Sequence, residues 1–460
     1  MATKAMTRSP GHRCSECGWS SVKWVGRCGE CQAWGTVSEV GPVKIRTSAA
    51  IVVDRPAVRI GEVDARRAQA RSTGVSELDR VLGGGLVRGA VALVAGEPGV
   101  GKSTLLLDVA AKAARQGQTV LYVSGEESAA QIRMRAERIE AMADNLFLAA
   151  ETDLATVLGQ IHQTGPDLVI IDSVQTIASG EVEGAAGNVS QIREVAASLI
   201  QVAKTQGISI VLVGHVTKDG SIAGPRVLEH LVDVVIQFEG ERHSRLRLVR
   251  AVKNRYGPTD EVGCFDLSDV GIIGLPAPSG LFLSSRDLMV PGTCVTVALE
   301  GRRPLVTEVQ ALLAATTAPS PRRTTSGLDS SRVAMILAVL DKRAHVPVRQ
   351  ADCYVSTVGG VKVSEPASDL AIALAMASSV SDRALPPGVV AMGEVGLAGE
   401  IRAVTGIPRR LAEAARLGFR HAVVPTGSMG SDPVPAGMEV FEVHDIRQAV
   451  SLVVPVLTGA

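Results

Sequence analysis

The segment GEPGVGKST, residues 96–104, constrains the fold of this chain more than any other feature. It matches the phosphate-binding pattern Gly-x4-Gly-Lys-Ser/Thr and lies between an apolar run and a helix-like stretch, the context that this pattern requires. The glycines let backbone N–H groups converge on phosphate oxygens, and the lysine adds a positive charge for the β and γ phosphates. The alternative, a chance Gly-rich turn, does not explain these flanks. We expect the segment to bind ATP through Gly96, Glu97, Pro98, Gly99, Val100, Gly101, Lys102, Ser103 and Thr104.

An aspartate at the end of a second apolar run gives this loop a metal partner. Residues 168–171 are apolar and are followed by Asp172, which would lie at the carboxyl edge of a parallel sheet. There Asp172 can hold Mg²⁺ through water while the Ser103 hydroxyl binds the ion. A buried strand that ends in Asp is common on its own. Together with the phosphate loop, it predicts a site for ATP and Mg²⁺.

Hydrolysis also needs a group that orients and deprotonates water. The stretch YVSGEES offers Glu126 and Glu127 at the end of the strand after the loop's helix. By similarity to recombinase-type ATPases, which carry a catalytic glutamate at this place, the register favours Glu126. The alternative is that both glutamates only begin the next helix, where the helix dipole stabilises them.

Composition limits where the chain works and what it binds. Lys plus Arg and Asp plus Glu both number 47 among 460 residues, so a net charge of zero offers no global attraction to nucleic acid or membrane. The N-terminal residues lack the apolar core of a signal peptide, and no apolar run approaches the ~20 residues that span a bilayer. Seven cysteines, an odd number, argue against a disulfide framework. We expect a cytoplasmic protein without a membrane partner.

Four of the cysteines form two CxxC pairs, Cys14 with Cys17 and Cys28 with Cys31, ten residues apart. This spacing predicts a C4-type zinc ribbon with one tetrahedral Zn²⁺, whereas a redox pair would need only one CxxC. All three tryptophans, Trp19, Trp24 and Trp34, lie in the same module. They can stack on nucleic-acid bases, but in so small a module we expect them to form its core.

The pattern from 72 to 275 predicts an α/β fold, because apolar strand-like runs alternate with helical stretches. Its continuous apolar strands fit a parallel sheet that is covered on both faces. The unpatterned segment 41–71, with seven basic and three acidic residues, is typical of a linker. Near 315–330 the chain is rich in Pro, Ser and Thr, which predicts a surface loop before a second α/β domain.

Three motifs resemble the RadA (Sms) family of bacterial DNA repair proteins. They are the segment 72–107 with the phosphate loop, the segment LVIIDSVQT, and the pentapeptide KNRYG at 253–257, whose tyrosine replaces a frequent phenylalanine. The resemblance spans essentially the whole chain. It implies four parts: a C4-type zinc ribbon at 1–40, a linker at 41–71, a RecA-like P-loop ATPase at 72–275 and a Lon-protease-like domain at 276–460.

The resemblance also implies an active site that is completed between subunits. Lys253 and Arg255 flank an asparagine just after the apolar strand RLRLVRAV, and for such a pair alone a solvated strand end is the usual interpretation. In RecA-type ATPases, however, cations at this place reach the γ phosphate of the neighbouring subunit, as a trans arginine finger does. This similarity implies a homo-oligomer, most simply a hexameric ring.

The segment 214–230 resembles the DNA-binding loop of the same ATPases. His215 stands where relatives carry a polar sensor of the γ phosphate, although it can equally be a packed polar residue at a strand end. In the Gly-rich loop after it, Lys218 and Arg226 are the candidate contacts to DNA phosphates.

The C-terminal part resembles the Ser-Lys peptidase domain of Lon but lacks both catalytic groups. Aligned on Pro366, the nucleophile position is Ala367, with Ser368 one place late, and Pro408 stands where the lysine belongs. Arginine cannot replace that lysine as a base at neutral pH. We expect an inactive peptidase that acts as a ring-forming platform, with Lys342, Arg343 and Arg349 as weak candidates for DNA contacts.

These features together predict a DNA-dependent ATPase that binds single-stranded DNA and drives branch migration of recombination intermediates. The partners implied by the resemblance are single-stranded and branched DNA, a RecA-type recombinase and further copies of the chain. The alternative is a KaiC-like scaffold or regulator, whose assembly is controlled by ATP and which has no motor activity.

Overall fold

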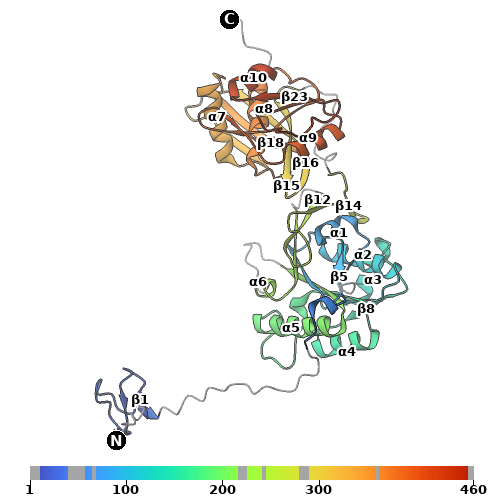
Figure 1. Ribbon diagram of the computed structural model, residues 1–460, viewed down its shortest axis with the longest axis vertical. Helices are drawn as coiled ribbons and strands as arrows, with labels where there is room; N and C mark the ends of the chain where they lie inside the picture. The colour runs from blue at the N-terminus through green and yellow to red at the C-terminus, as the bar shows by residue number, and fades with distance from the viewer. Residues whose placement is uncertain are drawn as a thin grey trace. The chain divides into compact units, whose positions relative to one another are not determined.

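The structure is a computed structural model, and it describes residues 11–39, 57–64, 69–215, 225–240, 245–278, 290–358 and 362–453. The chain divides into two compact units, Met1–Asp64 and Ala65–Ala460, and each is described by itself. The first unit contains a small antiparallel sheet in the order β2-β1-β3 (Figure 1). Its elements are β1 (His12–Cys14), β2 (Ser20–Ser21), β3 (Val37–Glu39) and the short helix η1 (Ile60–Glu62).

A nine-stranded sheet in the order β14-β13-β12-β11-β6-β10-β9-β7-β8 is the centre of the first part of the second unit. From β11 to β8 neighbouring strands pair in parallel, whereas β12, β13 and β14 extend the sheet as an antiparallel meander. The predicted parallel sheet is thus confirmed. The strands are β6 (Val91–Gly96), β7 (Val120–Ser124), β8 (Leu146–Ala150), β9 (Leu168–Asp172), β10 (Ser209–His215), β11 (Val234–Glu239), β12 (Leu246–Asn254), β13 (Val262–Ser268) and β14 (Gly271–Gly274).

Helices cover both faces of this sheet, which explains why its central strand β6 is apolar and buried along its whole length. In β6, Ala92 and Val94 pack on the side of α2 (Lys102–Arg115) and α3 (Ala129–Arg138). The alternate residues of β6 pack with α4 (Leu154–Thr164) and α5 (Val189–Gln206) on the other side. The remaining elements are β4 (Ala70–Arg71), α1 (Ser76–Leu82), β5 (Leu86–Val87), η3 (Val174–Thr176) and α6 (Pro225–Glu229).

The C-terminal part is built on a seven-stranded sheet in the order β17-β18-β16-β15-β19-β22-β23. Helices α7 (Ser330–Arg343), α8 (Asp369–Ser381) and α10 (Ile446–Val453) pack on one face, and α9 (Ile407–Arg416) packs on the other. The strands are β15 (Thr293–Glu300), β16 (Arg303–Ala315), β17 (Arg323–Ser326), β18 (Ala351–Thr357), β19 (Val389–Ala391), β22 (His421–Pro425) and β23 (Glu439–Val443), with η6 (Pro366–Ser368), β20 (Glu394–Val395) and β21 (Ile401–Arg402) outside the sheet.

Two local predictions need correction. The segment near 315–330 is not all loop, because Arg323–Ser326 forms the edge strand β17 beside β18. Its β-branched Thr324 and Thr325 suit a pleated strand in spite of the prolines before them. The strand predicted at 245–252 also continues farther, since pairing with β11 carries β12 to Asn254.

A buried ion pair joins the two sheets of the second unit. Arg303, at the start of β16, donates a hydrogen bond to Glu77 of α1, and both side chains are buried. The same guanidinium donates to the carbonyls of Val262, Leu275 and Pro276. An apolar cluster that includes Leu246 and Leu305 lies at the same junction.

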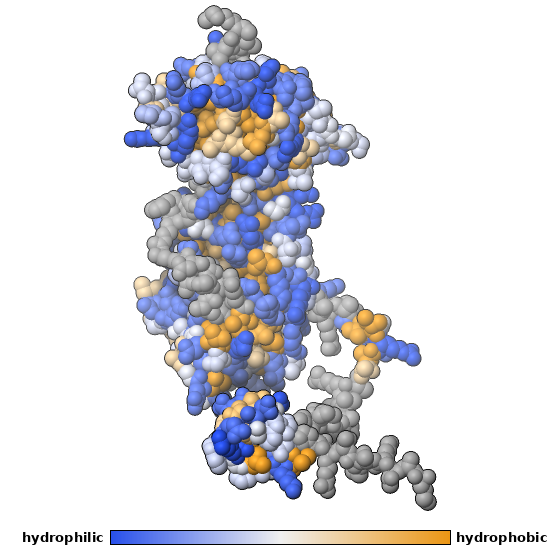
Figure 2. Space-filling view, turned by 90° about the vertical axis from the view of Figure 1, so that its left-hand side faces the viewer, coloured by the Kyte–Doolittle hydropathy of each residue, from blue (hydrophilic) through white to orange (hydrophobic). Residues whose placement is uncertain are grey.

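The surface mixes polar and apolar side chains. On the face shown in Figure 2, hydrophobic residues form small patches that hydrophilic residues separate. Among the helices within the described ranges, none is long and apolar enough to cross a membrane.

Candidate nucleotide site

The phosphate loop connects β6 to α2, as its sequence predicts. Gly99 and Gly101 have φ angles of 83° and 106°, a region that side chains disfavour. Lys102 is buried, and its Nζ donates to the carbonyl oxygens of Gly96 at 2.7 Å and Glu97 at 2.8 Å. Burial lowers the pKa of Lys102 to about 8, although Asp172 and Glu126 favour its charged form. Two backbone carbonyls of the loop therefore hold the Lys102 ammonium group against the loop.

Strands β12 and β14 of the antiparallel meander contact the phosphate loop. The φ of Gly101 favours glycine, and a Cβ there would also lie 2.4 Å from the Ile272 side chain of β14. Arg247 of β12 is buried, and its Nε donates to the Val100 carbonyl at 3.1 Å. Sequence reasoning missed Arg247; its only signal is an arginine within an apolar strand.

Strand order brings Asp172 to the loop. Strand β10 lies between β6 and β9, and the carboxyl ends of all three strands meet at one edge of the sheet. Asp172 is 6% exposed and accepts a hydrogen bond of 2.6 Å from the Tyr122 hydroxyl of β7. Burial and the Asp172 carboxylate raise the pKa of Tyr122 well above its usual value, so the phenol stays protonated and donates. Together with Ser103 in the first turn of α2, this carboxylate edge fits the oxygen ligands that Mg²⁺ prefers.

Glu126 lies at the same edge in a small polar cluster. Its Oε1 accepts from the Ser173 hydroxyl at 2.5 Å and lies 3.0 Å from Nε2 of His215. The hydrogen bond with His215 is the largest cause that lowers the pKa of Glu126, which falls to about 2. Glu127 instead pairs with Arg135 of α3. The geometry thus joins Glu126 and His215, the two residues whose roles the sequence left open, and separates Glu127 from them.

Lys253 and Arg255 lie at the opposite end of the strands, where the parallel strands β6 and β11 begin. The end of β12 pairs with the start of β11, and the Asp233 amide just before β11 donates to the Val91 carbonyl. Val91 and Gly96 are the two ends of β6, so roughly 16 Å of strand separates the cations from the phosphate loop of the same chain.

Local partners hold both cations at this end of the strands. Lys253 Nζ donates to the carbonyls of Glu229 and Val232 at 2.7 and 2.8 Å. Arg255 pairs with Asp233 at 3.1 Å, and Lys204 contacts the other oxygen of this buried carboxylate at 2.6 Å. The two cations and the phosphate loop of one chain therefore do not form a single site.

The structure describes the side chains of only some of the candidate DNA contacts. Lys218 lies outside the described residues, and Arg226 is part of α6 with its side chain outside the description. In the C-terminal part, Lys342, Arg343 and Arg349 are exposed.

The four cysteines of the N-terminal unit meet at one point. Their sulfur atoms all lie within 4.8 Å of one another, with 3.7 Å between those of Cys14 and Cys31 and 3.6 Å between those of Cys17 and Cys28. Four sulfurs at Zn–S bonds of ~2.3 Å form a tetrahedron with edges of about 3.8 Å, so the cluster fits a zinc ion.

The tryptophans of the ribbon do not all form its core, which corrects the prediction. Trp19 is partly buried against Cys14, Cys28 and Val37. Trp24 and Trp34, however, are 63% and 74% exposed. The cysteine cluster replaces the apolar core that we expected the indoles to supply.

The two positions that the sequence aligns with the Lon peptidase dyad lie in η6 and in the first turn of α9. Ala367 is buried in η6, and the buried Ser368 hydroxyl donates to the Glu365 carbonyl at 3.0 Å. Pro408 is in the first turn of α9. Two residues later, the fully buried Arg410 binds both oxygens of the Glu365 carboxylate at 2.5 and 2.8 Å.

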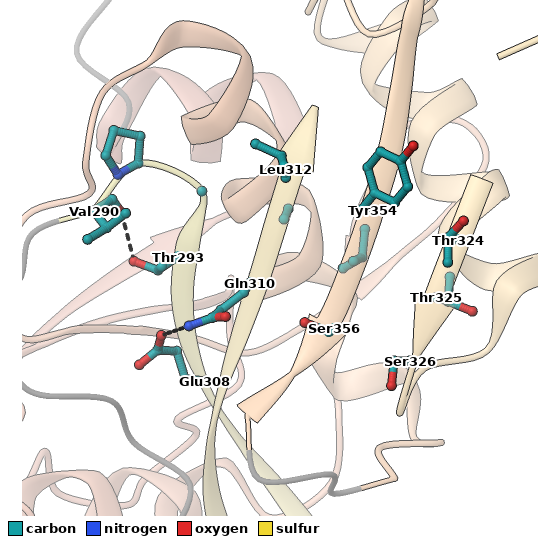
Figure 3. Close-up of a pocket in the computed structure, with 14 residues that line it drawn as sticks. Val290, Thr293, Glu308, Gln310, Leu312, Thr324, Thr325, Ser326, Tyr354 and Ser356 are labelled. Atoms are coloured by element: carbon teal, nitrogen blue, oxygen red, sulfur yellow. Dashed lines mark hydrogen bonds between the residues drawn. The ribbon is translucent and has the colours of Figure 1, made fainter. Parts of the chain in front are cut away.

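A pocket of about 470 Å³ lies on the sheet of the C-terminal part, away from the phosphate loop (Figure 3). Gln310 and Leu312 of β16, Tyr354 of β18 and Thr324 of β17 line it from adjacent strands. Gln310 Nε2 donates to Glu308 at 2.8 Å. Among the described residues that line the pocket none carries a cationic side chain, so these residues offer phosphate groups no positive partner.

Comparison with known proteins places these parts in families. Residues 55–221 match the model of an AAA domain, 12–39 that of a rubredoxin metal binding domain, and 330–428 that of subunit ChlI of Mg-chelatase. Among solved structures, a KaiC-like protein from Pyrococcus horikoshii OT3 matches 45% of this chain and 100% of its own, with 20% identity and a TM-score of 0.39.

Three relatives that match over nearly their full length are named DNA repair protein RadA. DNA repair protein RadA of Mycolicibacterium smegmatis is 55% identical over 449 residues, which cover 95% of this chain and 96% of the relative. RadA of Mycobacterium tuberculosis H37Rv is 53% identical, covering 97% and 93%, and RadA of Streptococcus pyogenes serotype M1 is 46% identical, covering 96% and 98%. With its ATPase domain, four-cysteine module and Lon-like C-terminal region, this chain belongs to the RadA family of DNA repair proteins.

Proposed function

We propose that this protein hydrolyses ATP to move along single-stranded DNA and so promotes branch migration of recombination intermediates. The observation that carries the proposal is the separation of two charged groups on one sheet. Lys102, Asp172 and Glu126 lie at the carboxyl edge, whereas Lys253 and Arg255 lie at the opposite end of the strands. Cations placed there do not reach the nucleotide of their own chain, and we propose that they serve the nucleotide of a neighbouring subunit, as in a ring in which ATP turnover changes the contacts between subunits.

In the proposed site each residue has one role. Lys102 releases the carbonyls of Gly96 and Glu97 and turns its charge to the β and γ phosphates. Asp172 and Ser103 hold Mg²⁺, which supplies charge neutralisation on the phosphate oxygens. Glu126 orients and deprotonates the attacking water, and His215 detects the γ phosphate through its contact with Glu126.

The other parts of the chain act on the proposed DNA track. Cys14, Cys17, Cys28 and Cys31 hold Zn²⁺, which stabilises the N-terminal ribbon. Lys218, in the segment after β10, and Arg226, in α6, contact DNA phosphates. The C-terminal domain serves as a platform of a hexameric ring without peptidase activity, which Ala367 and Pro408 support. A RecA-type recombinase is the proposed protein partner.

Steady-state ATP hydrolysis with and without single-stranded DNA tests the proposal, and Lys102→Ala controls for contaminating activity. Strong stimulation that depends on the lysine supports a DNA motor, and a branch-migration assay then follows. Turnover that ignores DNA favours the KaiC-like alternative, a scaffold whose assembly ATP controls. Degradation of casein in the same preparation would contradict the inactive-peptidase assignment.

A further inference from the structure

The ribbon exposes two large aromatic side chains that its fold does not need. Trp24 and Trp34 are 63% and 74% exposed, while Trp19 packs on the cysteine cluster. Within the described ribbon, 11–39, the apolar cluster is small, and a module of this size gains much from each buried aromatic ring. Leaving two indoles in solvent therefore points to a ligand that covers them.

The two indoles are close to each other and held in place. A Cβ on Gly26 would lie 3.6 Å from the Trp24 ring and 3.8 Å from the Trp34 ring, so both ring edges approach the same glycine. Trp24 Nε1 donates to the Val37 carbonyl at 3.0 Å, and Trp34 pairs with Arg27 in an isolated antiparallel bridge. The Trp24 ring, fixed by its hydrogen bond, loses little conformational freedom when a planar group stacks on it.

Positive side chains accompany the indoles. The Arg27 guanidinium lies over the Trp34 ring, 5.7 Å from its centroid, and the exposed Lys23 precedes Trp24. The acidic Glu16 and Glu30, by contrast, lie inside the two CxxC turns. The surface formed by Lys23, Trp24, Arg27 and Trp34, here named the indole surface, thus combines aromatic faces with cations.

We propose that the indole surface binds single-stranded DNA by stacking bases on Trp24 and Trp34, while Lys23 and Arg27 contact the phosphates. Aromatic faces beside cations are the features that single-stranded nucleic acids require, and stacking accepts any base. A protein partner could also use exposed tryptophans, but the cations beside both indoles favour a polyanion. The inference rests on the proposed function for the identity of the polymer, although it concerns a different part of the chain.

Tryptophan fluorescence of the full-length protein tests the proposal directly. All three tryptophans of the chain belong to the ribbon, so their emission reports on this module alone. We expect an oligonucleotide of about 20 nucleotides to quench the emission and an abasic oligomer of equal charge to quench it much less. Trp24→Ala and Trp34→Ala should each weaken the binding of the oligonucleotide roughly 5- to 100-fold.

Matched variants separate stacking from loss of fold. Val22→Ala changes an exposed apolar neighbour outside the indole surface and should leave quenching unchanged. Bound zinc is measured in each variant, and Trp34→Phe, which keeps an aromatic face, should recover much of the affinity.

Three results would overturn the assignment and also identify the error. If DNA stimulates ATP hydrolysis while the emission does not change, the indole surface is not the DNA contact and the proposed function stands. If emission responds to a RecA-type recombinase but not to DNA, the surface binds protein. If DNA changes neither emission nor hydrolysis, both proposals fail.

Discussion

The Tyr122 hydroxyl donates a 2.6 Å hydrogen bond to Asp172, and both side chains are buried at the carboxyl edge of the nine-stranded sheet. The bond occupies one carboxylate oxygen and fixes the direction of the other. Because burial keeps the phenol protonated, it remains a donor throughout the working range of pH. Tyr122 is therefore a positioning residue for the carboxylate that we assign to Mg²⁺.

Tyr122→Phe should raise the Mg²⁺ concentration needed for half-maximal ATP hydrolysis by roughly 10- to 100-fold, because the loss of a hydrogen bond to a charged group costs about 1.5–3 kcal/mol. ATP binding without Mg²⁺ should stay the same, as measured by a fluorescent nucleotide. The partly buried pocket residue Tyr354, far from the phosphate loop in the sequence, provides the control Tyr354→Phe. An unchanged Mg²⁺ requirement would show that Tyr122 has only a packing role.

ATP binding should take up a proton above pH 8. The pKa of Lys102 is about 8 in the structure because of burial, so the amine is mostly neutral at pH 9. Triphosphate oxygens would raise the pKa, and the amine would gain up to one proton on binding. Calorimetry at pH 9 in two buffers of different ionisation enthalpy measures this uptake. The uptake should disappear in Lys102→Ala, and persistence of the signal there would assign it to another group.

The pH profile of hydrolysis should depend on the contact between His215 and Glu126. With its pKa lowered from 4.5 to about 2, Glu126 stays ionised from pH 5 to 8, and the benefit of its charged form is lost only as pH falls toward 2. His215→Ala removes the largest cause of this shift, so the pKa should rise toward 4.5. The normalised single-turnover rate should then fall at a higher pH than in the wild type.

Ser173→Ala is the companion variant, because the Ser173 hydroxyl lowers the same pKa by a smaller amount. It should move the acid limb in the same direction as His215→Ala but less far. Glu126→Gln should abolish hydrolysis and keep ATP binding. An acid limb that stays in place in both His215→Ala and Ser173→Ala would contradict the assignment of Glu126 as the base.

The sequence predicted the sheet and the phosphate loop because both depend on local patterns. Continuous apolar strands and a Gly-rich turn before a helix are visible in a short window. The position of Asp172 near the phosphate loop was predicted in the same way, because the carboxyl ends of parallel strands meet at one edge of the sheet. Tyr122 and Arg247 could not be found in this way, because their roles depend on which strands become neighbours in the sheet.

In the N-terminal ribbon, the sequence predicted the metal site but not which side chains are exposed. Spacing alone predicted the four-cysteine cluster, because the tight CxxC turn makes its geometry local. The small size of the ribbon suggested that every tryptophan would be buried. The four-cysteine cluster instead takes the place of an apolar core, and Trp24 and Trp34 are exposed. Exposure is a property of the assembled module, and composition does not reveal it.

Mixing two inactive variants should restore hydrolysis if Arg255 acts on the neighbouring subunit. Lys102→Ala lacks the phosphate lysine and Arg255→Ala lacks the trans cation, but in a mixed ring roughly a quarter of the sites would keep both groups. Lys204→Ala is the matched control, since it weakens the same Asp233 cluster and leaves Arg255 in place. Activity equal to the sum of the two variants alone would contradict an action of Arg255 on the neighbouring subunit.

Arg410→Met should destabilise the C-terminal domain by about 3 kcal/mol without any effect on peptidase activity, which we expect to be absent. The fully buried guanidinium binds both oxygens of Glu365 and the carbonyls of Val297 and Thr405, so its removal leaves several polar groups without a donor. Hydrogen exchange of α9 in urea measures the loss. Arg416→Met, in the same helix, removes an exposed pair with Glu413 and should change stability by less than about 1 kcal/mol. Equal effects of the two variants would mean that the hydrogen bonds of Arg410 with Glu365, Val297 and Thr405 do not stabilise the domain.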